Sequence, residues 1–320
     1  MTPSVTEPLL SPLTNKPQTL QTLLRNAHDT RTSVMVPGVF NALVAKLAEA
    51  AGFSLLYVSG AGLSNTVGGY PDIGLLSGTE MIQQAGYIAR ATHCPVIADA
   101  DTGFGEAIQT FRAVQQYERE GVSGIHLEDQ VFPKRCGHLE GKQVVPTEVM
   151  VQKLQAACAA RTSPDFLIMA RTDAKSVEGM TGALLRARAY ADAGAGAIFP
   201  EALTSEDDFV TFARDFHATH PQIPLLANMT EFGKSPLIPA KTLGEMGYAL
   251  TLYPMTMCRI MLQSMQQALH TLATDGDQTG LISDMMTRQA LYETLHYSAY
   301  AELDAQLAAA APTEIPHQLA

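Results

Sequence analysis

From Ser33 onward, the chain alternates between short apolar segments and longer amphipathic ones. The short segments are apolar on both faces, which is typical of parallel strands buried between two layers. We predict strands at eight of them: 34–37, 55–59, 95–101, 124–129, 166–172, 197–201, 225–229 and 249–254.

The segments between these strands have the periodicity of amphipathic helices. Ile108, Phe111 and Val114 fall on one face of 106–120. A broader apolar band in 181–193 consists of Leu184, Leu185, Ala187, Ala189, Tyr190 and Ala193. Glycines follow four of the helical segments, at the position where a left-handed residue ends a helix: Gly52, Gly121, Gly194 and Gly247.

Eight strand–helix units predict a (β/α)₈ barrel over residues 17–282. The alternative is a doubly wound open sheet, which would need a glycine-rich turn after its first strand, and residues 37–40 do not supply one. We expect a leading helix at 18–28, a flexible N-terminus at 1–16 and a flexible tail at 312–320. The tyrosine-rich segment 283–311 is predicted to be a helical extension that either caps the barrel or packs on another subunit.

Composition narrows the class of protein. The 320 residues are 46% hydrophobic and 17% charged, as expected of a globular protein with a large core, and the net charge of −11 argues against a nucleic-acid-binding surface. The four cysteines are far apart, which indicates reduced thiols and a cytoplasmic location. We expect no membrane partner, since no apolar run approaches the roughly 20 residues of a membrane span, and no signal peptide is recognisable.

Polar residues repeatedly follow the predicted strands, where barrel enzymes carry their chemistry. Asp99 and Asp101 are two residues apart, so their side chains share one face of a strand. Clustered carboxylates favour Mg²⁺ or Mn²⁺, and Glu128 is placed to hold a coordinated water, with His126 supporting that shell. The alternative for the aspartate pair is helix capping near Glu106.

Cys136 lies in the segment Lys134-Arg135-Cys136-Gly137-His138. Neighbouring cations favour the thiolate, so this segment predicts a reactive thiol, whereas the other three cysteines are predicted to be structural. Arginines can bind substrate carboxylates through two parallel hydrogen bonds. The candidates are Arg171 at a strand end, Arg259 after the last strand, and Arg288, for which a solvated helical position is the simpler interpretation.

With these residues, the chain resembles the isocitrate lyase and phosphoenolpyruvate mutase superfamily, and within it the methylisocitrate lyases. The resemblance runs from Val34 to Tyr300 and depends most on segment 134–138. Supporting segments are 99–105, 126–130, 169–173, 199–202 and 228–233, of which the last favours methylisocitrate over isocitrate.

The resemblance implies a Mg²⁺-dependent barrel that cleaves 2-methylisocitrate to pyruvate and succinate, in a homotetramer of dimers that exchange C-terminal helices. Asp99 and Asp101 would address the metal, with Asp72 and Glu128 behind them. The implied substrate contacts are Ser59, Gly60, Ala61, Cys136, Gly137, Arg171, Glu201, Asn228, Met229, Thr230, Arg259 and Arg288. Ala61 departs from the glycine usual in relatives, so its methyl group could narrow the pocket.

The implied reaction requires a base for the substrate hydroxyl and an acid for the succinate carbanion. Cys136 is the expected acid, and Lys134, Arg135 and His138 would stabilise its thiolate. Tyr57 and a metal-linked carboxylate are both candidates for the base. The alternative substrates are isocitrate, dimethylmalate and oxaloacetate, and a phosphonate enzyme of the mutase type is disfavoured because it lacks the cysteine segment.

Overall fold

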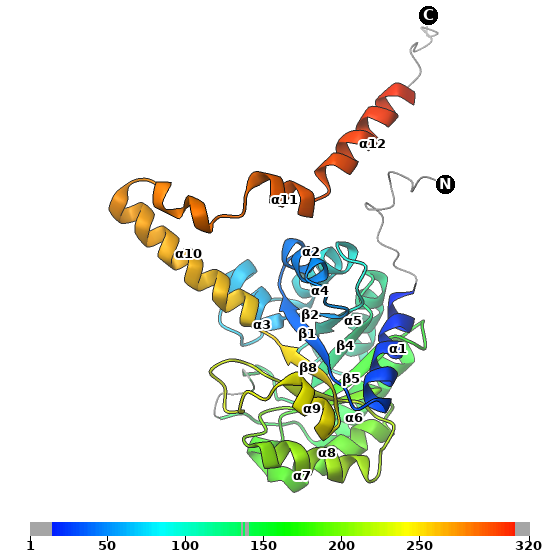
Figure 1. Cartoon of the computed structure of the whole chain (residues 1–320). Helices are drawn as coiled ribbons and strands as arrows, with labels where there is room; N and C mark the ends of the chain where they lie inside the picture. The colour runs from blue at the N-terminus through cyan, green and yellow to red at the C-terminus, as the bar shows by residue number, and fades with distance from the viewer. Residues whose placement is uncertain (1–14, 136, 138–140, 311–320) are drawn as a thin grey trace, which may run out of the picture. The chain divides into compact units, whose positions relative to one another are not determined.

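Eight parallel strands form a closed barrel in chain order, and β1 pairs with both β2 and β8. The structure is a computed structural model that describes residues 15–135, 137 and 141–310. Figure 1 shows the barrel strands surrounded by helices. The strands are β1 Val34–Val39, β2 Leu56–Val58, β3 Val96–Asp99, β4 Gly124–Glu128, β5 Leu167–Thr172, β6 Ala197–Pro200, β7 Leu225–Asn228 and β8 Tyr248–Tyr253. The predicted (β/α)₈ barrel is confirmed, and the open sheet is excluded.

The register of the ladders brings polar strand ends side by side. Asp99 of β3 pairs with His126 of β4, and Glu128 of β4 pairs with Arg171 of β5. Neighbouring parallel strands lie about 4.8 Å apart. Carboxylates and cations far apart in sequence therefore meet at the carboxyl end of the barrel.

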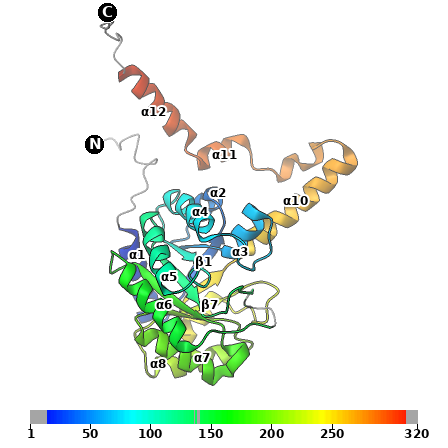
Figure 2. The same cartoon turned by 180° about the vertical axis from the view of Figure 1, so that it is seen from behind.

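Helices follow the strands and form the outer layer, which Figure 2 shows from behind. They are α2 Ala42–Ala50, α3 Gly60–Leu63, the π-helical turn η2 Ser64–Gly68, α4 Gly78–Arg90, α5 Ala107–Arg119, α6 Thr147–Ala160, α7 Lys175–Asp192, α8 Glu206–His217, α9 Ala240–Met246 and α10 Thr256–Asp275. The glycines predicted to end helices all have positive φ, between 85° and 106°, as expected for that position.

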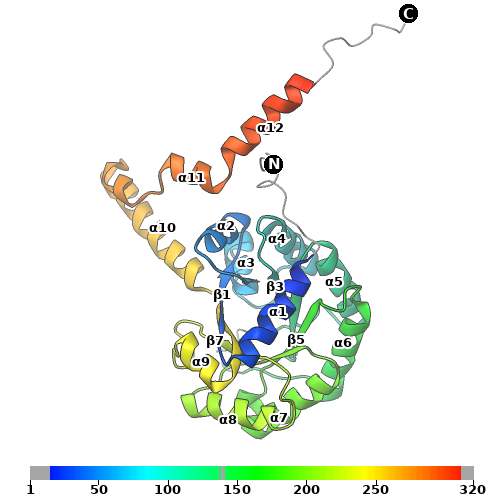
Figure 3. The same cartoon turned by 45° about the vertical axis from the view of Figure 1, so that its right-hand side comes forward.

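The leading helix α1, Lys16–Asp29, lies over one opening of the barrel (Figure 3). Its Leu20 and Leu24 are fully buried and pack with barrel-lining side chains such as Leu55 and Leu250. Lys16 is also buried, and its ammonium donates to the carbonyl oxygens of Ala89 and Thr92 at the end of α4. The helix predicted at 18–28 is confirmed, and it covers the amino end of the barrel strands.

Two of the predicted helix faces are only partly right. Val114 is fully buried, but Ile108 is 71% exposed because it lies in the first turn of α5. Leu184 is buried, whereas its neighbour Leu185 is 59% exposed. Apolar periodicity therefore located the helices correctly but overstated the width of their buried faces.

The described chain divides into two compact units, 15–267 with the barrel and 268–310 with the C-terminal helices. The division falls within α10. After α10 come the 3₁₀ helix η3 Thr279–Asp284, α11 Arg288–Thr294 and α12 Tyr297–Ala310, so the segment predicted to be a helical extension is largely helical. No side chain in 268–309 is buried within this chain. None of the helices in the described ranges has the length and apolar character needed to cross a membrane.

Candidate active site

Asp99 and Asp101 lie together at the carboxyl end of β3 and are 5% and 6% exposed. The amide of Asp101 donates to Asp99 Oδ1 at 2.9 Å, and Asp101 has a left-handed backbone with φ 45°. Gly60 approaches the same carboxylate so closely that a β-carbon there would lie 2.5 Å from Asp99 Oδ2. The predicted acid pair is thus a buried, confined site.

Lys134 extends into this acid pair. Its ammonium lies 2.9 Å from Asp101 Oδ1 and also pairs with Asp72, with a side chain that is 3% exposed. Asp72, which only the resemblance had suggested, therefore lies beside the acid pair. The structure places Lys134 on these carboxylates, and its assignment to a thiolate remains a prediction.

Glu128 lies behind the acid pair at the end of β4 and is 2% exposed. Within the described ranges, no hydrogen-bond donor reaches Glu128 Oε1. Burial raises the pKa of Glu128 well above its usual range, against the opposing effect of Arg171 and Lys134. Burial also raises the pKa of Asp101, and neighbouring Asp99 adds to the shift while Lys134 opposes it.

These oxygens fit a hard divalent cation. Mg²⁺ takes only one or two carboxylates directly and keeps several waters. The described residues contain no cluster of three or more His, Cys, Asp or Glu side chains that could hold a metal ion by themselves. Apart from the ion pair of Asp101 with Lys134, Asp101 Oδ1 and Glu128 Oε1 are buried without a hydrogen-bond partner among the described residues, so the prediction that they serve a cation and its water fits this geometry.

Tyr57 and His126 form a buried pair inside the barrel. The Tyr57 hydroxyl and His126 Nε2 are 2.7 Å apart, and His126 Nε2 is 3.4 Å from Asp99 Oδ1. Burial lowers the pKa of His126 to about 3, with Arg171 adding to the shift, so the imidazole is neutral. Burial and then Asp99 raise the pKa of Tyr57 well above its usual range, so the phenol keeps its proton.

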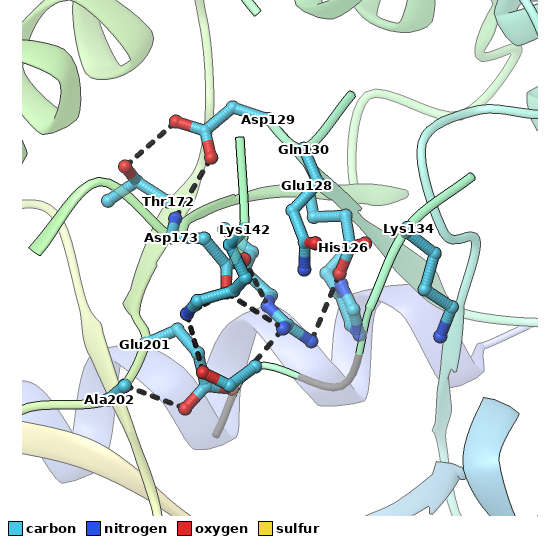
Figure 4. Close-up of polar contacts among 12 residues, drawn as sticks. His126, Glu128, Asp129, Gln130, Lys134, Lys142, Thr172, Asp173, Glu201 and Ala202 are labelled. Carbon is cyan, nitrogen blue, oxygen red and sulfur yellow. Dashed lines mark hydrogen bonds and ion pairs between the residues drawn. The ribbon is translucent and has the colours of Figure 1, made fainter. Parts of the chain in front are cut away.

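Arg171 is the central cation of the site and is 8% exposed. Its Nε and Nη2 donate to the two carboxylate oxygens of Asp173, at 2.9 and 3.2 Å. Its Nη1 lies 3.1 Å from Glu128 Oε2, and Nη2 lies 3.6 Å from Glu201 Oε2. The guanidinium carbon is 5.3 Å from the centre of the Phe199 ring. Figure 4 shows Glu128, Asp173 and Glu201 near one another in the site.

Gly137, within the predicted thiol segment, lies against this arginine. A β-carbon on Gly137 would be 2.6 Å from Arg171 Nη2 and 2.5 Å from Glu201 Cγ. Only a glycine lets the backbone approach so closely. The segment that carries the thiol therefore contacts the groups predicted to bind substrate. Cys136 and His138 themselves lie outside the described residues.

The ends of β6 and β7 contribute further polar residues to the site. Glu201 Oε1 accepts from the Ala202 amide at 2.7 Å, and Asn228 Nδ2 donates to Glu201 Oε2 at 3.1 Å. Asn228 Oδ1 is buried and has no hydrogen-bond donor within the described chain. Met229 is buried, and its sulfur accepts from the Ile238 amide, whereas Thr230 is half-buried.

Segment 59–61 forms the start of α3. Ser59 is 1% exposed, and its hydroxyl accepts from the Gly62 amide at 3.1 Å and donates to Met255 Sδ at 3.4 Å. Ser59 is thus a helix cap in this structure. Ala61 is half-buried, so its methyl group is partly accessible.

The two outer arginines differ in their settings. Arg259 lies 3.5 Å from Glu231 Oε2 and 5.4 Å from the centre of the Phe232 ring, with a side chain that is 45% exposed. Arg288 is exposed at the start of α11, in the C-terminal unit. Arg259 therefore belongs to the barrel unit, whereas the role of Arg288 as a substrate contact stays a prediction.

Several buried polar residues around Arg171 were not among the predicted site residues. Lys142 pairs with Asp173, and Gln130 is hydrogen-bonded to Arg135. Asp173 had a signal in the sequence, because it follows a strand end beside Arg171. Lys142 had none, since a lysine in a polar loop is normally solvated.

The closed barrel, with paired carboxylates and a buried arginine at the carboxyl ends of its strands, defines an enzyme of the (β/α)₈ class that acts on small anions. A family model described as phosphoenolpyruvate phosphomutase matches residues 24–273. The chain belongs to this family.

Individual relatives resemble the chain over most of its length. One from Corynebacterium glutamicum, named probable 2-methylisocitrate lyase 2, is 48% identical over 272 residues, which cover 85% of this chain and 87% of that protein. A crystal structure of 2,3-dimethylmalate lyase, described as a PEP mutase/isocitrate lyase superfamily member, has a TM-score of 0.83 and 36% identity, covering 90% of this chain and 95% of that one. A structure of phosphonopyruvate hydrolase in complex with oxalate and Mg²⁺ has a TM-score of 0.80 and 29% identity, covering 91% and 98%.

Proposed function

We propose that this protein is a carbon–carbon lyase that cleaves 2-methylisocitrate to pyruvate and succinate. The observation that carries the proposal is the contact of Gly137 with Arg171 and Glu201, because it joins the cysteine segment to an arginine site beside Asp99 and Asp101. The 48% identity with a protein named probable 2-methylisocitrate lyase supports the choice of substrate.

The cofactor in this proposal is Mg²⁺, for which Mn²⁺ can substitute. Asp99 and Asp101 would hold it, with Glu128 and Asp72 bound to its waters. When bound, it supplies a Lewis acid that lowers the pKa of the substrate hydroxyl and stabilises the oxyanion. The similarity to a phosphonopyruvate hydrolase solved with Mg²⁺ supports this assignment.

The first proton leaves the substrate hydroxyl and is accepted by a base of the site. The raised pKa of Tyr57 and its hydrogen bond to His126 disfavour a tyrosinate. Tyr57 and a metal-linked carboxylate are the two candidates for this base, and the state of Tyr57 favours the carboxylate.

Loss of that proton drives cleavage of the carbon–carbon bond. The alkoxide carbon becomes the carbonyl of pyruvate, and the bonding electrons move to the succinate half as an aci-carboxylate. Asp173 holds Arg171 by accepting a hydrogen bond from its Nε. In this proposal Arg171 stabilises the negative charge as it develops, which is how fixed donors lower a barrier. Cys136 then donates its proton to the carbanion, and Lys134, Arg135 and His138 favour the thiolate that remains.

The remaining predicted contacts would bind the substrate carboxylates and exclude water. In this proposal the pyruvate half lies against Ser59, Gly60 and Ala61. The other half faces residues of the barrel unit: Gly137, Glu201, Asn228, Met229, Thr230 and Arg259. Arg288 is a further contact that the resemblance implies.

Product identification tests the proposal. Racemic 2-methylisocitrate, isocitrate and 2,3-dimethylmalate are incubated separately with the protein and Mg²⁺, and keto acids are identified by mass spectrometry. We expect pyruvate and succinate from 2-methylisocitrate at the highest kcat/KM. Glyoxylate from isocitrate as the preferred reaction, or no keto acid from any substrate, would contradict the assignment.

Cleavage of 2,3-dimethylmalate is the second candidate function. It is favoured by the structural similarity to 2,3-dimethylmalate lyase, with a TM-score of 0.83 over 90% of this chain. The two substrates differ in their number of carboxylates, so the same experiment separates the candidates by their kcat/KM ratio.

We also propose that the protein assembles as a homotetramer of dimers that exchange C-terminal helices. In the first turns of α10, Cys258 is the one buried side chain of the described helix, while Met257, Ile260 and Met265 are 40% to 60% exposed. In β1, Met35 is 48% exposed although it belongs to a barrel strand. A second copy of the chain would cover such apolar surface. The separated cysteines favour a cytoplasmic location for this assembly, and the proposed substrate favours a role in propionate catabolism.

A further inference from the structure

Residues 135 and 137, on either side of Cys136, are each held by a buried polar side chain. We propose that these two side chains, Gln130 and Lys142, are positioning residues that set the place of the thiol segment against Arg171. The inference rests on the proposed function, because it assigns the segment a role in the same reaction.

Gln130 follows β4 and is 2% exposed. Its Nε2 donates to the Arg135 carbonyl oxygen at 2.8 Å, and its Oε1 accepts from the Arg135 amide at 3.0 Å. Both polar groups of one residue are thus engaged by one side-chain amide. Two antiparallel hydrogen bonds of this kind fix orientation as well as distance.

Lys142 holds the other side. Its ammonium donates to the Gly137 carbonyl oxygen and to Asp173 Oδ1, the latter at 2.8 Å. The side chains of Lys142 and Asp173 are 1% and 0% exposed. A buried charge pair is costly to separate, so the lysine has little freedom to leave this position.

The partners of these two residues are themselves fixed. The Asp173 amide donates to Asp129 Oδ1 at 2.9 Å, and the Thr172 and Tyr190 hydroxyls each donate to Asp129 Oδ2 at 2.8 Å. Figure 4 shows Asp129 bound to Thr172 and Asp173, and Lys142 beside Asp173. Arg135 and Gly137 are therefore tied, through Gln130 and Lys142, to the ends of β4 and β5.

The Asp173 carboxylate binds both Arg171 and Lys142. Asp173 gives both oxygens to Arg171 and one of them to Lys142. Asp173 thus sets the distance between Arg171, which stabilises the carbanion in this proposal, and the Gly137 backbone, which Lys142 holds next to the proposed proton donor. Such alignment is worth about 100-fold in rate for a misplacement of about 1 Å.

The experiment compares Gln130→Met and Lys142→Met with the wild-type chain. Both substitutions keep an unbranched side chain and remove the hydrogen bonds. We expect kcat with 2-methylisocitrate to fall about 100-fold while KM changes by less than about threefold, because Arg171 keeps its two bonds to Asp173. The solvent deuterium isotope effect on kcat should rise, since proton donation becomes slower than the other steps.

Lys16→Met is the matched control. Lys16 is likewise buried and donates to two backbone carbonyl oxygens, but at the end of α4. It should lower the melting temperature and leave kcat within about threefold of wild type. If all three variants lose stability and kcat in parallel, the effect is general and the positioning role is refuted.

Hydrogen exchange of the unliganded protein tests the inference without substrate. Peptides that cover 133–137 should exchange faster in Gln130→Met and Lys142→Met, and equally fast in Lys16→Met and wild type. Unchanged exchange there, or a kcat within about threefold of wild type in both variants, overturns the inference. A wild-type protein that releases no keto acid overturns the proposed function instead, and the exchange data then still decide on the positioning.

Discussion

At the scale of single residues, the site is a set of buried charges that neutralise one another. Asp99, Asp101 and Asp72 face Lys134, and Arg171 faces three further carboxylates. Removing one member of a buried pair leaves an uncompensated charge, which typically costs about 3–5 kcal/mol. Substitutions in this cluster therefore have to be judged by stability as well as by activity.

Cys136→Ser tests the proposed proton donor. Serine is a far weaker acid, so kcat should fall about 10²–10⁴-fold while substrate still binds. Steady-state kinetics measure this, and circular dichroism shows whether the fold is kept. Near-native turnover in Cys136→Ser would remove the thiol from the mechanism, and Cys158→Ser serves as the control on a helix.

Asp99→Asn with Asp101→Asn tests the metal assignment while keeping side-chain shape. In the wild-type chain, Mg²⁺ at 100 times its Kd should raise the free energy of unfolding by about 2.7 kcal/mol. The double variant should show no such increase in thermal unfolding and no turnover. Asp208→Asn, at the half-buried pair with Lys175 away from the acid pair, is expected to respond to Mg²⁺ like wild type. A double variant still stabilised by Mg²⁺ would place the metal elsewhere.

The residues that sequence reasoning could find share one property: they lie at or next to the carboxyl end of a strand. Asp99 and Glu128 end their strands, Arg171 is the next-to-last residue of β5, and Glu201 directly follows β6. All four are buried in the site. Asp72 and Lys142 lie in loops, and their partners are 62 and 31 positions away in sequence. Only the folded backbone brings such partners together, so no local pattern indicates them.

At the scale of elements, strand position was easier to predict than helix surface. The predicted strand 55–59 is observed as Leu56–Val58, because Ser59 already caps α3. An apolar run predicts that a strand exists, whereas the residue at which the strand ends depends on where the next helix begins. α7 starts at Lys175, before the predicted 181–193, and is kinked at Gly179 with φ 74° and ψ −175°. The kink separates the first turn of α7 from the rest of the helix. The sequence of that turn has little apolar periodicity, so the predicted helix began after it.

The contact between α1 and α4 gives a stability prediction. Lys16→Met leaves the Ala89 and Thr92 carbonyl oxygens without this donor, at a cost of about 1–3 kcal/mol. Burial lowers the pKa of Lys16 to about 8, against about 10.4 in an unfolded chain. Between these values the unfolded chain binds more protons, so the stability contributed by Lys16 rises with pH.

Urea denaturation at pH 7 and pH 10 measures the effect. The difference in free energy of unfolding between the wild-type chain and Lys16→Met should be larger at pH 10. A difference that shrinks toward pH 10 would mean that the ammonium form is favoured by folding, contrary to the burial argument.

At the scale of the whole molecule, the C-terminal unit has apolar side chains without a core of its own. Leu269, Met286 and Leu307 are 66%, 52% and 63% exposed. Sequence periodicity predicted helices here but left open what covers them, because an apolar stripe is the same whether its partner is intramolecular or a second chain.

Charge substitution on this unit tests the proposed assembly. Leu269→Glu with Leu272→Glu should shift the protein from a tetramer to smaller species, as measured by size-exclusion chromatography with light scattering. Both side chains are exposed in this chain, so the fold of an isolated barrel should persist. Gln266→Glu with Thr274→Glu adds the same charge at exposed polar positions and should leave the assembly intact. An unchanged tetramer in the leucine variant would show that another surface holds the subunits together.

The loop 131–143, which contains the thiol segment, has its two ends side by side, because residues 129–131 pair with residues 143–145. Gln130 and Val144 form an isolated antiparallel bridge, the Val131 amide donates to the Gln143 carbonyl oxygen at 2.9 Å, and the Val145 amide donates to Asp129 at 2.8 Å. Because the two ends are already joined, replacing residues 131–143 keeps the connection to the barrel, provided the new stretch keeps cations at Lys134 and Lys142, which pair with buried Asp101 and Asp173. This stretch can therefore vary in the residues that it presents to Arg171 while its two ends and its two buried ion pairs stay the same.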